Sequence, residues 1–271
     1  MILIPQGLDN LIGAVGDAIK TAPTFYEDAL QPTVQETGKI LALIPQTIES
    51  ALLPLRKWNI DREYKFAETK KMLEYKLQNI DPDKIVTPEA YVAVPAIQAI
   101  SYSMDSEELR NLYANLLAKS MNSDSKDAVH PSFVEIIKQM SPIDVQIFEI
   151  IRNSKVRPLI TLSICLSNGG LIPINKNCSW INRFSLDQCC ASFNNLSRLG
   201  LITIPAIGEY TYPEHYSSVK ENVLFIEAEK LAQQRLENGS SIFYEKHFIE
   251  LNDFSDLFYS VCSKNDFSII Q

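Results

Sequence analysis

Glycine and histidine are both scarce in this chain of 271 residues. It contains nine glycines and three histidines, and no P-loop, HExxH or GxSxG motif occurs. So few glycines do not favour a glycine-rich nucleotide-binding loop or a low-complexity tail. The missing motifs leave no signature of phosphate-loop, zinc-protease or serine-hydrolase chemistry. We therefore expect a protein that is not an enzyme and has no catalytic residues to assign.

Paired cysteines are also lacking. An odd number of cysteines without a CxxC spacing predicts reduced thiols in a cytoplasmic protein, and it does not favour a structural zinc site. A neighbouring pair on a helix is more typical of a core than of redox chemistry. We expect no metal site and no cofactor. The five cysteines are Cys165, Cys178, Cys189, Cys190 and Cys262.

Positively charged residues are fewer than negatively charged ones. The chain has 25 Lys and Arg against 33 Asp and Glu, for a net charge of −8. This balance argues against a protein built around nucleic-acid binding. Hydrophobic residues make up 46% of the chain and charged residues 21%, which is typical of a globular protein of one large or two modest domains.

The N-terminal segment, residues 1–24, lacks early positive charge. It begins MILIPQGLDNLIGAVGDAIK, an apolar stretch that Asp9 and Asp17 interrupt. This pattern fits neither a secretory signal nor a transmembrane span. An amphipathic helix packed on its own domain is favoured, and peripheral contact with a membrane or a partner stays open.

Helical periodicity dominates residues 25–128, which we interpret as a helical domain. Apolar residues recur on helical faces in residues 33–57, 59–80 and 107–120. The polar loop at 121–128 marks its end.

Two details of this domain are predicted from single residues. Asp105 or Ser106 should cap the helix that begins at Glu107. A short helix is expected from Pro95 to about Tyr102, with the proline in its first turn, after a proline-marked connector.

One histidine, His130, lies in the stretch DAVHPSFVEIIKQMSPIDVQIFEII, residues 127–151. Pro131 and Pro142 each stand where a helix would begin, and Ser141 can cap the second helix. Asp144 follows that cap by three residues. We therefore interpret His130 as a cap or hinge residue, because a catalytic histidine would need a nucleophile and an orienting group within reach.

In the second half of the chain we expect two helices and then a strand. PLITLSICLSNGG, residues 158–170, looks helical and ends in two glycines. Ser185 should cap the next helix and Gly200 should end it. LITIP, residues 201–205, then alternates as a strand does. The side chains expected to face inward from the helix are Leu186, Cys189, Cys190, Phe193 and Leu196.

Three further elements complete this half. An inserted helix is expected near 217–238, a returning strand at 245–251 and a closing helix capped by Asn252. A capped helix, then L-x-x-L-G-L-I, then a strand is typical of a winged helix. We predict a mainly α fold in which the N-terminal helical domain is followed by a winged-helix-like α+β domain at 129–265, with a small antiparallel β-wing.

The helix at 185–199 would be the recognition helix of such a domain. Five basic residues and one acidic residue lie between 155 and 200, which is sparse for phosphate binding. Packing or protein contact is therefore favoured over DNA binding. The candidate DNA-contacting residues are Arg183, Gln188, Asn194, Asn195 and Arg198.

The chain resembles the abortive-infection alpha family of bacterial proteins, often called Abi-alpha. The resemblance is good over residues 25 to 150 and looser around NLSRLGLI, and we do not follow it through 209–244 or beyond 251. The stretches that carry it are YEDALQPTVQETGKIL (26–41), ALLPL (51–55), IVTPEAYVAVPAIQAI (85–100), EELRNLYANLLAKS (107–120) and HPSFVEIIKQMSPID (130–144).

The resemblance implies a role in bacterial defence against phage, in which infected cells stop growing or die before progeny are released. It supplies no catalytic residues. We expect a cytoplasmic, non-enzymatic protein that acts through contacts with a host or phage protein or with itself. A winged-helix DNA-binding regulator is the alternative, and a membrane-acting effector using the N-terminal helices is a further one.

Overall fold

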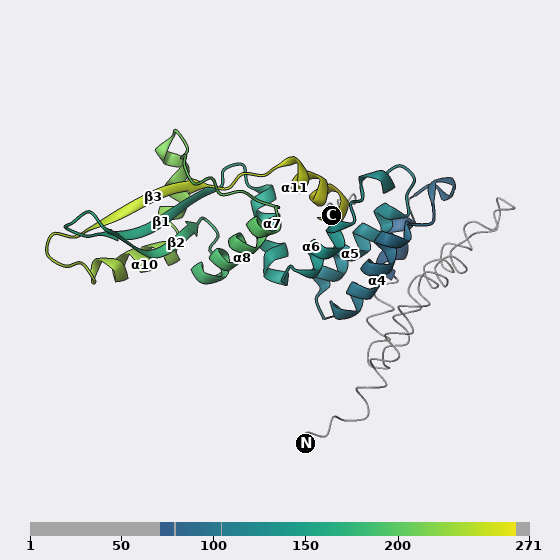
Figure 1. Cartoon of the computed structure of the whole chain (residues 1–271), viewed down its shortest axis with the longest axis horizontal. Helices are drawn as coiled ribbons and strands as arrows, with labels where there is room; N and C mark the ends of the chain where they lie inside the picture. Colours follow the sequence, from purple (N-terminus) through teal and green to yellow (C-terminus); the bar gives the residue numbers. More distant parts are fainter. Residues whose placement is uncertain (1–70, 79, 104, 264–271) are drawn as a thin grey trace, which may run out of the picture. The chain divides into compact units, whose positions relative to one another are not determined.

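The computed structural model describes residues 71–78, 80–103 and 105–263 (Figure 1). Among them, one compact unit ends at Gln139 and includes the segment from Tyr259 to Ser263, and a second comprises Met140–Phe258. We call them unit 1 and unit 2. The segment 1–24, the helix expected at 33–57 and most of that at 59–80 lie outside the described residues, although residues 71–77 are helical. The domain limits expected from the sequence stay a prediction.

In the described part of unit 1, α4 (Ala90–Tyr102), α5 (Glu107–Ser120) and α6 (Ser132–Lys138) pack on one another. Of two short 3-10 turns, η2 (Pro82–Lys84) precedes α4, and η3 (Lys126–Ala128) lies between α5 and α6. The apolar stripe predicted for α5 is confirmed, since all of its members are buried: Leu109, Leu112, Tyr113, Leu116 and Leu117.

Helix α5 also makes polar contacts outside its apolar stripe. The hydroxyl of Ser106 caps it by accepting a hydrogen bond from the Leu109 amide at 3.2 Å. The side-chain amide of Asn115 donates to the carbonyl of Cys262 at 2.6 Å. Cys262 belongs to η5 (Tyr259–Ser263), one turn of π-helix, so a buried polar contact ties this late turn to the central helix of unit 1.

The helix expected from Pro95 starts earlier than predicted. Helix α4 begins at Ala90, with Pro95 inside it. Pro95 has no N–H to donate to the carbonyl four residues before it. The helix nevertheless runs through this position because its buried face starts at Val92 and extends to Ile100, and packing overrides local propensity.

Unit 2 contains α7 (Pro142–Asn153) and a three-stranded antiparallel sheet. Strand β1 (Pro158–Cys165) lies between β2 (Leu171–Ser179) and β3 (Ser241–Phe248). The helix predicted for 158–170 is therefore wrong. From Ile160 to Ile164, apolar residues alternate with Thr161 and Ser163, a period of two that is typical of a strand, and β1 is a central strand whose residues from Pro158 to Ile164 are all buried.

Helices follow and interrupt the strands of unit 2. They are α8 (Leu186–Arg198), α9 (Ser217–Lys220), α10 (Val223–Gln233) and α11 (Asp253–Phe258), with a 3-10 turn, η4 (Pro213–Tyr216), before α9. One sheet face is covered by α9 and α10 (Figure 1). There Ile160 and Leu162 of β1 share a core with Phe225 and Ala232 of α10.

The fold is mainly helical with a small antiparallel sheet, as the sequence predicted. The inserted helix near 217–238 is present as α10. The strand expected at 201–205 is reduced to one bridge between Thr203 and Glu250, and the returning strand begins earlier, at Ser241. The winged-helix assignment is not confirmed, because the element before α8 is a β-hairpin and not the second helix of a helix-turn-helix.

Candidate functional site

Helix α8, the predicted recognition helix, is defined at both ends by local interactions. The Ser185 hydroxyl accepts from the Gln188 amide at 3.2 Å, and the Gln188 side chain accepts from the Ser185 amide at 3.0 Å. Gly200 follows the helix with φ +75°, a conformation that glycine adopts without strain. Of the five side chains expected to face inward, Cys189, Phe193 and Leu196 are buried, and Leu186 and Cys190 are half-buried.

The opposite side of α8 is open to solvent, and we call it the α8 face. Asp187 and Arg198 are its charged members, so its formal charge is close to zero. Such a surface offers hydrogen-bonding amides and hydroxyls without the excess of Lys and Arg that phosphate binding requires. Its exposed residues are Asp187, Gln188, Ala191, Asn194, Ser197 and Arg198.

Four of the five candidate DNA-contacting residues are exposed at or beside the α8 face: Arg183, Gln188, Asn194 and Arg198. The guanidinium of Arg183 lies over the ring of Phe184, 5.7 Å from its centroid. Gln188, Asn194 and Arg198 lie on α8, and Arg183 lies two residues before its N-cap, Ser185. Their binding role stays a prediction.

Asn195, the fifth candidate, is occupied by partners inside unit 2. Its side-chain nitrogen donates to the carboxylate of Asp144 at 3.0 Å, and its side-chain oxygen accepts from Arg198 at 2.7 Å. The residue is half-buried. Both polar atoms of the amide are thus engaged, one with Asp144 of α7 and the other with Arg198 within α8, which leaves Asn195 less suited to contact a ligand than its neighbours.

Asp144 is a buried carboxylate that joins two helices. One of its oxygens accepts from the Ser141 amide at 2.7 Å, the Ser141 hydroxyl at 2.9 Å and Asn195 at 3.0 Å. The bond from the Ser141 amide belongs to the capping box that starts α7, which the sequence predicted, and the Asp144 amide completes the box by donating to the Ser141 hydroxyl at 3.2 Å. The third, across 51 residues of sequence, had no local signal.

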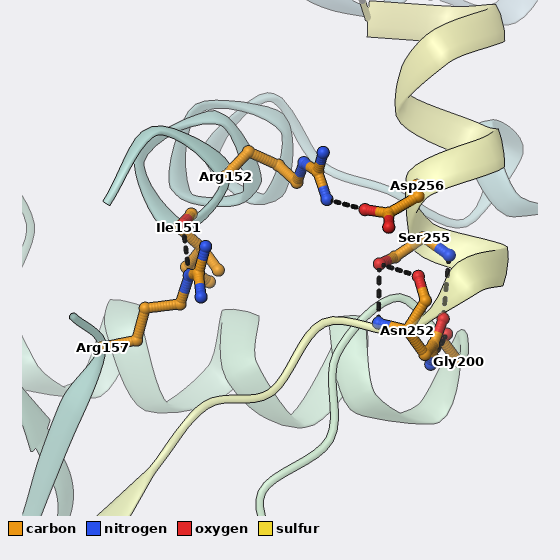
Figure 2. Close-up of polar contacts among 7 residues, drawn as sticks. All are labelled: Ile151, Arg152, Arg157, Gly200, Asn252, Ser255 and Asp256. Atoms are coloured by element: carbon orange, nitrogen blue, oxygen red, sulfur yellow. Dashed lines mark hydrogen bonds and ion pairs between the residues drawn. The ribbon is translucent and has the colours of Figure 1, made fainter. Parts of the chain in front are cut away.

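The far end of α7 is fixed by charged groups that sequence reasoning also missed. Arg152 forms an ion pair with Asp256 of α11, and the Arg157 side chain donates to the carbonyl of Ile151 at 2.6 Å (Figure 2). The Arg152 side chain is 19% exposed whereas that of Asp256 is 59% exposed. This pairing connects elements 104 residues apart, so no spacing in the sequence could reveal it.

Asn252 caps α11, as the sequence predicted. Its side-chain oxygen accepts from the Ser255 amide at 2.8 Å, and its side-chain nitrogen donates to the carbonyl of Gly200 at 3.1 Å (Figure 2). The residue that ends α8 and the residue that starts α11 are therefore in direct contact.

His130 is engaged in local backbone geometry. Its Nδ1 accepts from the Ser132 amide at 3.2 Å and lies 2.7 Å from the Ser132 hydroxyl. These contacts lie at the start of α6, whose N-cap residue is Pro131 without a side-chain capping bond, so a role of His130 as a cap or hinge residue stays a prediction. In unit 1 the ring also lies beside Phe133, with 6.0 Å between ring centroids.

The cysteine thiols are free, and three of the five are buried. Burial raises the pKa of Cys178 from 9.0 to about 12, and it raises the pKa values of Cys189 and Cys262 as well. A thiol held protonated in this way is a poor nucleophile. Among the described residues, no group of His, Cys, Asp and Glu has an arrangement that could hold a metal ion.

None of the helices in the described ranges has the length and hydrophobicity that a bilayer crossing requires. Comparison with models of known families matches residues 61–262 to the family described as abortive infection alpha. No curated protein and no solved structure matches the chain significantly.

Proposed function

Because the chain belongs to the abortive infection alpha family, we propose that it protects bacteria against phage in the cytoplasm through protein contacts and without catalysis. The observation that carries the proposal is the family match, which spans described residues of both units. The contact surface that we assign is the α8 face. Its near-neutral, polar character and its rigid attachment through Asn195 support a docking role.

The proposal predicts that a bulky charge at the centre of the α8 face abolishes protection. Ala191 is exposed there, and Ala191→Arg adds a long cation without removing any buried group. Arginine is a good helix former, so α8 should persist. The matched control is Glu227→Arg on the exposed side of α10.

The measurement is the efficiency of phage plating on cells that carry each variant. We expect phage to plate on cells with Ala191→Arg as efficiently as on cells without the gene. Cells with Glu227→Arg should stay protected. Full protection by Ala191→Arg, at an expression level equal to that of the wild-type protein, would remove the α8 face as the contact surface.

DNA binding through α8 is the second candidate function, and the exposure of Arg183 and Arg198 at and beside the α8 face is the observation that favours it. Replacing both with alanine should then weaken DNA binding at low salt and flatten its salt dependence, since each phosphate contact contributes to that slope. If the wild-type protein shifts no duplex at low salt, this candidate is rejected.

A further inference from the structure

The distal end of the sheet in unit 2 has an unusual composition. Neither residues 158–175 nor residues 238–244 contain Asp, Glu, Lys, Arg or His. The first segment contains the turn between β1 and β2, and the second contains the turn that enters β3. The two turns are neighbours, because a Cβ built on Gly239 would lie 3.3 Å from the Cβ of Ser167. We call residues 166–175 and 238–243 the hairpin tip.

The hairpin tip is well ordered by its own backbone bonds. The Leu166 amide donates to the carbonyl of Gly170 at 2.8 Å, and the Gly169 amide donates to the carbonyl of Leu166 at 2.9 Å. The side chain of Asn168 accepts from the Gly170 amide at 3.0 Å. Gly169 has φ +82°, which a side chain would strain. The turn therefore presents a fixed shape.

Large apolar side chains are exposed at this tip. Leu171 is 48% exposed, Ile172 47% and Phe243 42%. In the sheet register, Leu171 pairs with Cys165 and Phe243 pairs with Ser163. Residues 163 and 165 are two apart on β1, so Leu171 and Phe243 lie on one face of the sheet.

Ile172 points to the other face. It pairs with Ile164, the residue between Ser163 and Cys165, and alternate residues of a strand face opposite ways. The tip is thus apolar on both faces, in a region without charge. The docking surface of a folded protein covers one face and usually has a polar, charged rim. An environment that surrounds the tip from all sides fits these positions better.

We propose that the hairpin tip inserts into the headgroup and acyl boundary of a lipid bilayer. Exposed aliphatic and aromatic groups gain free energy there in proportion to the apolar area that leaves water. Charged groups would oppose insertion, and the tip has none. The serines, asparagines and glycines of the two turns suit the headgroup layer.

Two other occupants fit less well. A second copy adding a strand to the free edge of β2 would meet Pro173, which has no N–H to donate. An anionic bilayer would be disfavoured by the net charge of −8. The occupant is therefore a zwitterionic bilayer surface, and its binding should depend little on salt.

The test is sedimentation of the full chain with phosphatidylcholine vesicles. The tip variant carries Leu171→Thr, Ile172→Thr and Phe243→Thr, which keeps residues suited to strands and removes the apolar groups. The control carries Ile207→Thr, Val223→Thr and Leu231→Thr, three apolar side chains that are exposed elsewhere on unit 2. Circular dichroism establishes that both variants fold.

We expect the wild-type protein and the control to pellet with vesicles, and the tip variant to partition at least about tenfold less. Adding phosphatidylglycerol should not strengthen binding. The proposal is overturned if the wild-type protein does not pellet. It is also overturned if the tip variant pellets equally, since residues 1–24 or another surface would then be responsible.

A fluorescence measurement locates the tip directly. Ile172→Trp should show emission that shifts to the blue on adding vesicles and is quenched by lipids brominated in their acyl chains. Unchanged emission while the protein pellets would place the tip outside the bilayer and contradict the proposal. Both measurements use purified protein, so their outcome is independent of whether the protein confers phage defence.

Discussion

At the scale of single residues, one oxygen of the Asp144 carboxylate accepts three hydrogen bonds, two from Ser141 and one from Asn195. A buried acceptor of this kind orders the start of α7 and the orientation of α8 together. The α8 face is therefore held by a residue outside it, and a change at Asp144 should act on stability first and on function through it.

Asp144→Ala should lower the free energy of unfolding by about 2 kcal/mol, because it removes a helix cap and leaves a half-buried amide without its acceptor. Urea unfolding followed by circular dichroism measures this change. Glu227→Ala, at an exposed carboxylate of α10, should stay within about 0.5 kcal/mol of the wild-type protein. Equal stability of the two variants would contradict the structural role of Asp144.

Buried thiols make stability depend on pH in the alkaline range. Burial raises the pKa of Cys178 from 9.0 to about 12, so its thiol ionises in the unfolded chain before it ionises in the folded protein. The unfolded state then binds fewer protons, and the free energy of unfolding falls as pH rises from about 9 towards 12. Below pH 9 this contribution is constant.

With Cys178→Ala, the free energy of unfolding should decrease less steeply with pH, by up to about 1.4 kcal/mol per pH unit. Urea unfolding at a series of pH values between 8 and 11 (about three pH units) covers the window. Identical slopes for the variant and the wild-type protein would show that Cys178 does not titrate differently in the two states.

At the scale of elements, several helix starts were predicted correctly, whereas β1 was predicted as a helix. Ser141, Ser185 and Asn252 all cap helices as expected, because a cap depends on residues within three or four positions. Strand β1 depends on partners far along the chain, since β3 begins at Ser241. The alternation of Thr161 and Ser163 with apolar residues is the local signal that favours this strand over a helix.

The candidate site, too, could be predicted only where its features depend on residues close in sequence. Exposure of Gln188 and Asn194 follows from the period of α8, which the sequence supplied. Engagement of Asn195 by Asp144, and the pairing of Arg152 with Asp256, come from tertiary packing across long separations. Periodicity alone could not distinguish an exposed polar residue from one that holds a neighbouring helix.

Pro95 offers a test of the helix that starts earlier than predicted. Within α4, Pro95→Ala restores an N–H that can bond the carbonyl of Tyr91, so the free energy of unfolding should rise by about 1 to 2 kcal/mol. Thermal unfolding of the two proteins measures it. If Pro95 stood in the first turn of a helix instead, the substitution would leave stability unchanged or lower it.

At the scale of the whole molecule, family membership extends over most of the described chain. The proposed contacts use unit 2: the α8 face for a protein, and the hairpin tip for a bilayer. Because these surfaces share no residues, their variants separate the two roles. Loss of protection by Ala191→Arg with unchanged vesicle binding would assign defence to the α8 face alone.

The most direct test of the central proposal is the growth of cells carrying this gene after phage addition, at a low and at a high ratio of phage to cells. Abortive infection predicts that the culture survives at the low ratio and collapses at the high one, because each infected cell stops growing or dies without releasing progeny. Lysis equal to that of cells without the gene at both ratios, across a broad panel of phages, would contradict the proposal.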